Sequence, residues 1–256
     1  VARLTENLVA NVYRSFDAEP FLSTVTSRLN EAANRHLAEV LAPLRTSIPD
    51  YLRAVRRRQL PRNWWEVDYQ EQHVRAEINA VLADGIPLGW VPPPRVVMRL
   101  LDASGPQARR RVVSDSRQAI LTHADGVLAR LPAAGALYYA DQIRAAIAAI
   151  KDGHVNAGQA LATNVLDTVI TQHTLAALEV HPATLNNKSY DKKLRDQGLR
   201  MALSLVQLST VMRGRYTITD PIRHYRRNAT AHAVHRVQYN GINAVIAVMN
   251  ATAVLV

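Results

Sequence analysis

Cysteine is absent from this 256-residue sequence. A disulfide framework, a thiolate nucleophile and a cysteine-ligated metal are therefore excluded. Glycine and proline are scarce, at 10 and 12 residues, which argues against a loop-rich all-β fold. The one long apolar run, Ile242 to Val256, is short for a membrane span and carries Asn243 and Asn250. We interpret it as a buried core helix. Because the N-terminus also lacks the apolar core of a signal peptide, we expect a soluble cytoplasmic protein.

Acidic side chains are in deficit: 31 Lys and Arg stand against 21 Asp and Glu, which gives a formal net charge of +10 at pH 7. All but four of the cations are Arg, whose planar guanidinium grips phosphate through two parallel hydrogen bonds. This balance favours an anionic partner, with nucleic acid first and an acidic protein second. The alternative is that the Arg-rich and Ala-rich composition reflects a GC-rich genome and has no bearing on function.

The first half of the chain, residues 1–131, is predicted to be an accessory helical region of unknown role. Leu22 to Leu44 has apolar residues at helical spacing. Two adjacent tryptophans, Trp64 and Trp65, cannot face the same side of a helix, so one is expected in the core and the other either exposed or at a domain joint. The density of Gly and Pro from Asp84 to Pro94 excludes regular structure there. A helix is predicted over 94–103 and a turn at Ser104-Gly105-Pro106. The next predicted helix has Arg109-Arg110-Arg111 near its start and runs to about Leu131.

We place a domain boundary between residues 131 and 132, in the segment Pro132 to Gly135. Four helical blocks are predicted beyond it, and no strand pattern or internal repeat is visible. Long antiparallel helices joined by short loops form a bundle, so the predicted fold class is all-α. The blocks are 136–151, ended by Asp152-Gly153; 154–179; 190–212; and a last block within 223–256.

The polar start of the last block contains Arg227-Asn228-Ala229-Thr230-Ala231-His232. Asp220-Pro221 resembles a helix start, which would place this segment where backbone N–H groups favour an anion. Asn228 and His232 are four residues apart and share a helix face. Arg227 lies about 140° around the helix from His232, so the pair converges poorly within one chain. Two copies facing each other across a dimer axis would converge better.

The four C-terminal blocks, with Arg-Asn-x-x-x-His at the head of the last, resemble HEPN domains (higher eukaryotes and prokaryotes nucleotide-binding). The hallmark of that family is an Arg and a His separated by four to six residues, often with a polar residue after the Arg, and RNATAH fits it. The resemblance covers about residues 136–256, so 132–256 is predicted to be a HEPN-like bundle. Residues 1–131 resemble no family.

The resemblance implies a metal-independent endoribonuclease that acts as a homodimer on RNA, without a cofactor, as a toxin or defence effector. His232 would act as general base or acid at the 2′-OH or the leaving 5′-oxygen. Arg227 would hold the scissile phosphate, and Asn228 would orient the His or the phosphate. An antitoxin or regulatory protein would restrain the enzyme. The expected substrate contacts are Arg223, Arg226, His235, Arg236 and Tyr239.

Each of these residues also has a structural interpretation. Arg227 suits a solvated surface, Asn228 a helix cap, and His232 a hydrogen-bonded structural role. A zinc site can be drawn from His224, His232 and His235, although no carboxylate or Cys lies within the cluster to complete it. Two alternatives for the whole chain therefore remain: a non-catalytic helical module that binds nucleic acid or an acidic protein, and a purely structural protein.

Overall fold

The computed structural model describes residues 59–67, 71–132, 134–174, 198–212, 223–232 and 234–256. These residues form helices and connecting segments and contain no β-strand, which confirms the predicted all-α class. The chain divides into two compact units, Val1–Arg53 and Ala54–Val256, and all described residues belong to the second. The helix predicted over Leu22 to Leu44 lies outside them.

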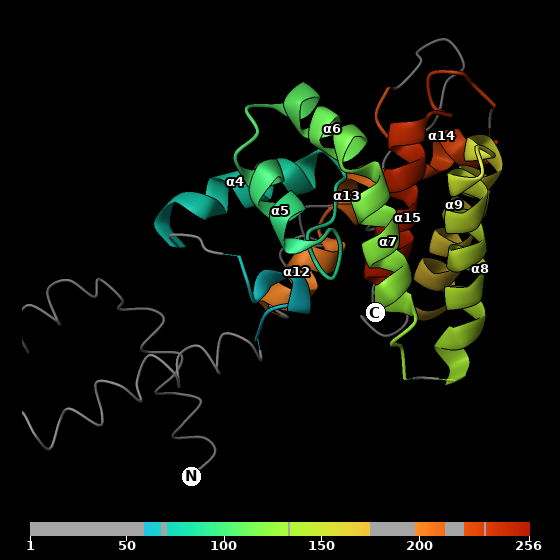
Figure 1. Cartoon of the computed structure of the whole chain (residues 1–256), viewed down its shortest axis with the longest axis horizontal. Helices are drawn as coiled ribbons and strands as arrows, with labels where there is room; N and C mark the ends of the chain where they lie inside the picture. The colour runs from blue at the N-terminus through green and yellow to red at the C-terminus, as the bar shows by residue number, and fades with distance from the viewer. Residues whose placement is uncertain (1–58, 68–70, 133, 175–197, 213–222, 233) are drawn as a thin grey trace, which may run out of the picture. The chain divides into compact units, whose positions relative to one another are not determined.

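Figure 1 labels the described α-helices in chain order. None of the described helices is long and apolar enough to cross a membrane. Their bounds are η1 Arg62–Trp64, α4 Glu71–Ala83, α5 Pro94–Leu101, α6 Pro106–Asp115, α7 Arg117–Leu128, α8 Ala134–Lys151, α9 Val155–Val169, the π-helical turn η2 Ile170–Thr174, α12 Leu199–Leu205, α13 Leu208–Val211, α14 Arg227–His232 and α15 Gly241–Leu255.

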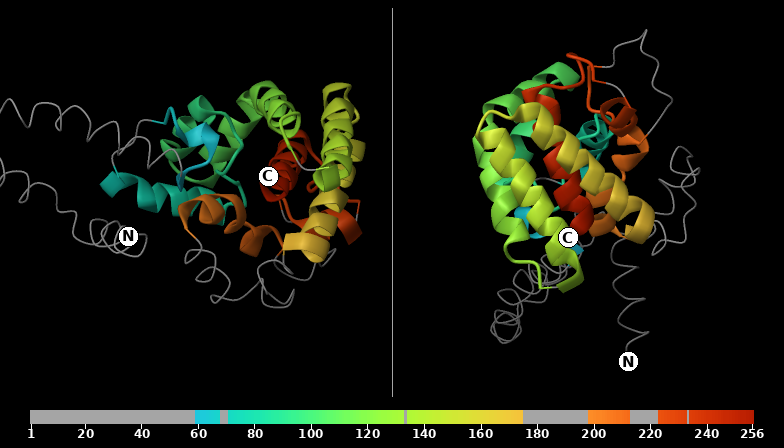
Figure 2. Two further views of the ribbon diagram at one scale, coloured as in Figure 1. Left: turned by 90° about the horizontal axis from the view of Figure 1, so that it is seen from below. Right: turned by 90° about the vertical axis from the view of Figure 1, so that its right-hand side faces the viewer.

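Helix α15 is the centre of the core. It packs against α6, α7, α8, α9 and α12, and the further views in Figure 2 show it beside the α8–α9 pair. Every residue from Asn243 to Ala253 is buried, so the helix is enclosed on all sides. The prediction that Ile242 to Val256 is a buried core helix is confirmed. The side-chain oxygen of Asn240 caps its start by accepting hydrogen bonds from the backbone N–H groups of Ile242 (3.1 Å) and Asn243 (3.0 Å).

Helices α8 and α9 form an antiparallel hairpin. The helix α8 ends at Lys151, as the Asp152-Gly153 pair predicts, and Gly153 adopts a φ of 91°, which a glycine reaches without strain. The two helices approach closely at Gly158, because a Cβ atom there would lie 2.7 Å from the carbonyl oxygen of Ala146 and 2.4 Å from the side chain of Ile150. A side chain at position 158 would therefore force the hairpin apart.

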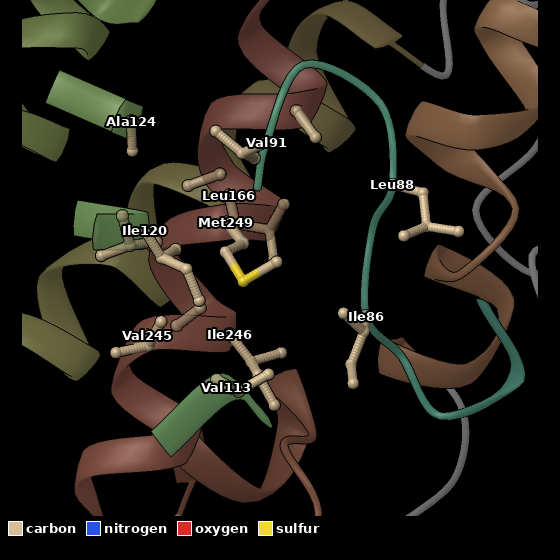
Figure 3. Close-up of a cluster of buried hydrophobic side chains, with 14 of the residues drawn as sticks. Ile86, Leu88, Val91, Val113, Ile120, Ala124, Leu166, Val245, Ile246 and Met249 are labelled. Atoms are coloured by element: carbon tan, nitrogen blue, oxygen red, sulfur yellow. The ribbon is translucent and has the colours of Figure 1, made fainter. Parts of the chain in front are cut away.

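The segment between α4 and α5 has no regular structure, as its Gly and Pro content predicts. Its apolar side chains are nevertheless buried: Ile86, Leu88 and Val91 are drawn in Figure 3 with the core residues around Met249. The backbone N–H groups of Leu88 and Gly89 both donate to the carbonyl oxygen of Leu203. This loop therefore forms part of the core.

The adjacent tryptophans separate as expected. Trp64 is 1% exposed and Trp65 is 42% exposed. The indole N–H of Trp64 donates to the carbonyl oxygen of Leu88 at 2.7 Å, which satisfies its polar atom in the core. The predicted boundary between residues 131 and 132 stays a prediction, and described residues on both sides of it contribute to one hydrophobic cluster.

Two predicted helices are interrupted. The helix expected after the 104–106 turn and up to about Leu131 breaks at Ser116, whose carbonyl oxygen accepts from Ile120 to begin α7 while its hydroxyl accepts from Arg99. The described part of the block 190–212 is divided into α12 and α13. The side-chain amide of Gln207 is buried at this break and donates to Ser204 O (2.6 Å) and Asn250 Oδ1 (3.2 Å). In both cases a tertiary hydrogen bond accompanies the local break.

The last predicted block also differs from the structure. The Arg-Asn-x-x-x-His segment was expected at the head of the last helix, and it forms a separate six-residue helix, α14, instead. A segment from His235 to Asn240 turns the chain before α15 begins. The reason is the Asn240 cap followed by Gly241, which starts a new helix there. Asp220-Pro221, the predicted helix start, lies outside the described residues.

Candidate active site

The Arg-Asn-x-x-x-His segment occupies α14, which packs against α9 (Figure 1). The helix is six residues long, so its dipole is smaller than that of a long helix. Any selectivity for an anion must therefore come mainly from side chains. The side chains on the facing surface of α9 decide how those of α14 are held.

Three polar residues of α9 face this segment: Gln159, Thr163 and Asp167, which we call the polar row. Their spacing of four residues puts them on one side of the helix. Gln159 and Thr163 are fully or almost fully buried, at 0% and 1% exposed. Since a buried polar group is costly without a partner, each of them must be hydrogen bonded. The partners lie in the segment from Tyr225 to Asn240.

Asp167 is paired with Arg227 through the guanidinium Nη2 and the carboxylate Oδ2. The two side chains are 29% and 19% exposed, so the pair is only partly open to solvent. Arg227 also donates from Nη1 to the side-chain oxygen of Asn228 at 2.5 Å. Within the described part of the chain, the buried Arg227 Nε and Asp167 Oδ1 atoms have no hydrogen-bond partner. The pair is thus close but not fully satisfied.

Thr163 is bonded to Tyr225, with the two hydroxyl oxygens 3.0 Å apart. Tyr225 is 1% exposed, and burial raises the pKa of its phenol well above the ordinary value. The hydrogen bond with Thr163 and the charge of Arg227 act in the opposite direction and are outweighed. Tyr225 is therefore neutral at physiological pH and anchors the chain immediately before α14.

Gln159 forms hydrogen bonds both to α14 and to the segment that follows it. Its amide nitrogen donates to the hydroxyl of Thr230 (3.1 Å) and to the carbonyl oxygen of Gln238 (3.0 Å). Its amide oxygen accepts from the backbone N–H of Asn240 at 3.3 Å. The side chain of Gln238 accepts from Thr230 (3.2 Å) and from the N–H of Arg226 (2.9 Å). This buried network fixes α14 and the segment after it on α9.

His232 is the last residue of α14 and is exposed, whereas Arg227 faces α9. The helix is continuous between them, so the two side chains project about 140° apart. Asn228 lies one turn before His232 and contacts Arg227. One copy of the chain therefore brings Arg227 and Asn228 together and directs His232 elsewhere.

The expected substrate contacts fall into two groups. Arg236 is exposed and His235 is half-buried, with its ring Nδ1 accepting from the N–H of Val237 at 3.2 Å. The Tyr239 hydroxyl donates to the carbonyl oxygen of Thr230 at 2.8 Å, and burial raises the pKa of that phenol. Arg223 is exposed and Arg226 is half-buried, and both precede α14. Tyr239 thus has a structural contact, and the four cationic or imidazole residues flank α14 on both sides.

The geometry offers no metal centre within the described residues, where no group of three or more His, Asp or Glu could hold an ion. Several residues that shape the site were missed by the sequence analysis: the polar row, Thr230 and Gln238. One signal was present, because Gln159, Thr163 and Asp167 recur at a constant spacing of four, which puts three polar residues on one side of a predicted helix. Asp167 is also the one carboxylate within 155–170.

Comparison of the chain with protein-family models, with curated proteins and with solved structures gives no match. The resemblance to HEPN domains therefore depends on the Arg-Asn-x-x-x-His segment and the helical blocks alone.

Proposed function

We propose that this chain is a metal-independent endoribonuclease of the HEPN type, acting as a toxin or defence effector. The observation that carries the proposal is the way in which α14 is held in place. An exposed His232 and an Arg227–Asn228 pair are held on a short helix by a buried hydrogen-bond network. Such preorganised polar groups are expensive to build into a core, and catalytic sites are where they are most useful.

The reaction is transesterification by the RNA 2′-OH. His232 accepts the 2′-OH proton while the 2′-oxygen attacks phosphorus, or donates a proton to the departing 5′-oxygen. An imidazole suits both roles because it exchanges protons near neutral pH. Arg227 stabilises the charge that develops on the phosphate, with Asn228 beside it. The products are a 2′,3′-cyclic phosphate and a free 5′-OH, and DNA is not cut because it lacks the 2′-OH.

Convergence of the two residues requires a second copy of the chain. Because His232 and Arg227 project about 140° apart on α14, a homodimer would place the His of one protomer beside the Arg of its partner. Arg223, Arg226, His235 and Arg236 would contact the flanking RNA. A ribonuclease of this kind needs a restraint in the cell, so an antitoxin or another regulatory protein is part of the proposal.

The test compares wild type, His232→Ala and Arg227→Ala on total RNA in EDTA, with fragments and their 3′ ends as the readout. Each variant should lose about 100-fold or more of the activity. His154→Ala and Arg111→Ala, at exposed positions, are the matched controls and should cleave normally. Equal cleavage by all proteins would place the activity elsewhere and overturn the proposal, as would intact RNA with wild type.

A mixing experiment tests the dimer. His232→Ala retains Arg227, and Arg227→Ala retains His232, so a mixed dimer contains one complete site if the pair comes from two protomers. Activity should then reappear when the two inactive variants are mixed. No recovery in a mixture shown to exchange subunits would contradict a shared site.

One observation favours a second candidate, a non-catalytic module that binds nucleic acid or an acidic protein. Asp167 already neutralises Arg227, so the cation would have to exchange that carboxylate for a phosphate before it could stabilise a transition state. Salt-sensitive RNA binding that survives His232→Ala, with no cleavage by wild type, would establish this alternative.

A further inference from the structure

Three aromatic side chains lie at the open end of the α8–α9 hairpin, away from the Asp152-Gly153 turn (Figure 1). Tyr138 and Tyr139 come from the start of α8, and His173 comes from η2, which follows α9 directly. The ring centroids of Tyr138 and Tyr139 are 5.6 Å apart, and those of Tyr139 and His173 are 5.5 Å apart, with interplanar angles of 72° and 68°. Both contacts are edge-to-face, and we call these three residues the aromatic row.

The row ends at the π-helical turn η2, which is wider than a turn of α-helix. The hydroxyl of Thr174 donates to the carbonyl oxygen of Val169, five residues earlier, at 3.3 Å. Two consecutive residues of the turn reach one hydroxyl group: the Tyr139 oxygen lies 3.4 Å from Gln172 Oε1 and 3.1 Å from His173 Nε2. Single π-helical turns are rare and are frequent at functional sites, so this turn is a second sign, beside the ring contacts, of a ligand site.

One arrangement of protons satisfies both hydrogen bonds of the Tyr139 hydroxyl. The Nε2–H group of His173 donates to the hydroxyl oxygen, and the hydroxyl donates to Gln172 Oε1. The exposed Gln172 then presents its amide N–H groups as donors, and the exposed His173 presents Nδ1 as an acceptor. Hydrogen-bonding groups of both kinds beside an aromatic ring suit an unpaired nucleobase, which stacks through its face and is hydrogen bonded at its edge.

Tyr138 is the outer ring of the row and is 67% exposed. An exposed aromatic residue by itself is ordinary on a protein surface. Here the ring is held in contact with Tyr139, whose own hydroxyl is fixed by two hydrogen bonds. Because the contact with Tyr139 is edge-to-face, it covers at most one of the two faces of the Tyr138 ring. The other face is available for stacking.

We propose that the aromatic row binds an unpaired nucleobase of single-stranded RNA, with the base stacked on Tyr138 and the polar atoms of Gln172 and His173 available to the same nucleotide. The identity of the strand rests on the proposed function, and the net charge of +10 favours such a polyanion. Gln172 follows Asp167, the partner of Arg227, by five residues, which is about 8 Å along the helix axis. Since neighbouring phosphates of a stacked strand are about 3.4 Å apart, a few nucleotides bridge this distance.

The first experiment measures binding of a labelled single-stranded oligodeoxynucleotide by fluorescence anisotropy over a range of salt concentrations. DNA keeps the bases and lacks the 2′-OH, so the probe stays intact. Tyr138→Ala should weaken binding about tenfold, the effect of losing one stacked base, and leave the log–log salt slope unchanged because no phosphate contact is lost. Leu137→Ala changes the neighbouring side chain, which is 46% exposed, and is the control that should bind like wild type. Tyr138→Trp keeps an aromatic face and should bind at least as tightly as wild type.

The second experiment uses unmutated protein and follows the ring protons of Tyr138 by NMR, assigned with Tyr138→Phe. A base stacked on the ring should shift these signals upfield. A probe made of abasic sugar–phosphate units keeps the charges and lacks the bases, so it should leave the Tyr138 signals in place and bind equally to wild type and Tyr138→Ala. Equal shifts with both probes, or equal affinities of Tyr138→Ala and Leu137→Ala for the oligodeoxynucleotide, would overturn the site. No binding of the oligodeoxynucleotide by wild type would overturn it also.

A second copy of the chain is the competing occupant of this surface. Analytical ultracentrifugation of wild type and Tyr138→Ala decides between the two. Loss of self-association in Tyr138→Ala, with oligodeoxynucleotide binding unchanged, would assign the row to contact between copies and overturn the base site.

These outcomes are separable from those for catalysis. If wild type cleaves RNA and Tyr138→Ala binds and cleaves like Leu137→Ala, the base site fails alone. If wild type binds the strand through Tyr138 and never cleaves RNA, the ribonuclease proposal fails and the base site remains as part of a binding module.

Discussion

Asp167 near the end of α9 and Arg227 at the start of α14 form an ion pair that is largely withdrawn from solvent. Asp167 is the charged residue of the polar row, and the other two residues form the Thr163–Tyr225 and Gln159–Thr230 hydrogen bonds. The three residues of the polar row therefore hold α14, and Tyr225 just before it, against one face of α9. The ion pair that stabilises the packing of α14 on α9 therefore also limits how readily Arg227 can bind another anion.

Asp167→Asn should lower the free energy of unfolding by about 1–2 kcal/mol. This lies between the small contribution of an exposed ion pair and the 3–5 kcal/mol lost when a buried pair is broken. Urea denaturation measures the change. The control is Asp125→Asn, which breaks an exposed pair with Arg144 and should leave the urea midpoint nearly unchanged. Equal midpoints for wild type and Asp167→Asn would show that the Arg227 pair contributes nothing.

The same substitution should strengthen binding of a single-stranded oligodeoxynucleotide, by about three- to tenfold, because a carboxylate that competes with phosphate for Arg227 is removed. Fluorescence anisotropy with Asp167→Asn and Asp125→Asn makes the comparison. Weaker binding by a folded Asp167→Asn protein would mean that the carboxylate positions Arg227 rather than competing for it.

Gln159→Met should destabilise the protein by about 2–3 kcal/mol. Met is close to Gln in shape but cannot form its hydrogen bonds, so the donors and acceptors of Thr230, Gln238 and Asn240 lose their partner. It should also lower RNA cleavage, although Gln159 has no contact with His232 in this structure. Asn164→Met, at an exposed position of the same helix, is the control and should change stability by no more than about 0.5 kcal/mol. Full activity in a folded Gln159→Met protein would separate the network from function.

Tyr225→Phe tests the buried phenol through the pH dependence of stability. Burial raises the folded pKa of Tyr225, so above about pH 10 the unfolded chain releases a proton that the folded chain retains. The unfolded state then binds fewer protons, and stability falls as pH rises, by up to about 1.4 kcal/mol per pH unit. Tyr225→Phe should cost about 1 kcal/mol at neutral pH and lack this component of the alkaline loss.

The measurement is urea unfolding from pH 7 to pH 11. Tyr138→Phe, which changes a residue that is 67% exposed, is the control and should follow wild type throughout. Identical alkaline slopes for wild type and Tyr225→Phe would contradict the assignment.

Gly158→Ala and Gly126→Ala form a matched pair of helical substitutions. At Gly158 a Cβ would meet the Ala146 carbonyl at 2.7 Å, so overpacking should destabilise the protein by about 1–3 kcal/mol despite the better helix propensity of Ala. At Gly126 the nearest atom is the end of Arg130 at 3.8 Å, so the change should stabilise by about 0.5–1 kcal/mol. Thermal unfolding measures both, and an unchanged or raised Tm for Gly158→Ala would mean that the α8–α9 contact tolerates a methyl group.

The sequence correctly predicted features that depend on local pattern. The apolar run that became α15, the end of α8 at Asp152-Gly153 and the irregular segment after Asp84 were all readable, because burial period and turn chemistry are properties of neighbouring residues. The order of the two tryptophans was not, since either could have been the buried one. The continuous helices predicted across Ser116 and Val206 were wrong, because the side chains that accompany those breaks bond to Arg99 and Asn250 far along the chain.

The candidate site likewise has features that the sequence predicted and features that only the tertiary structure decided. The residues Arg227, Asn228 and His232 were found from their spacing, which the sequence alone determines. Their directions were decided by the tertiary structure: α14 ends at His232, and Asp167 takes Arg227. Pairing across long separations depends on how helices pack around α15, and a spacing rule holds no information about it. The candidate residues could therefore be named from the sequence, whereas the partner of each charged group was decided by the tertiary packing.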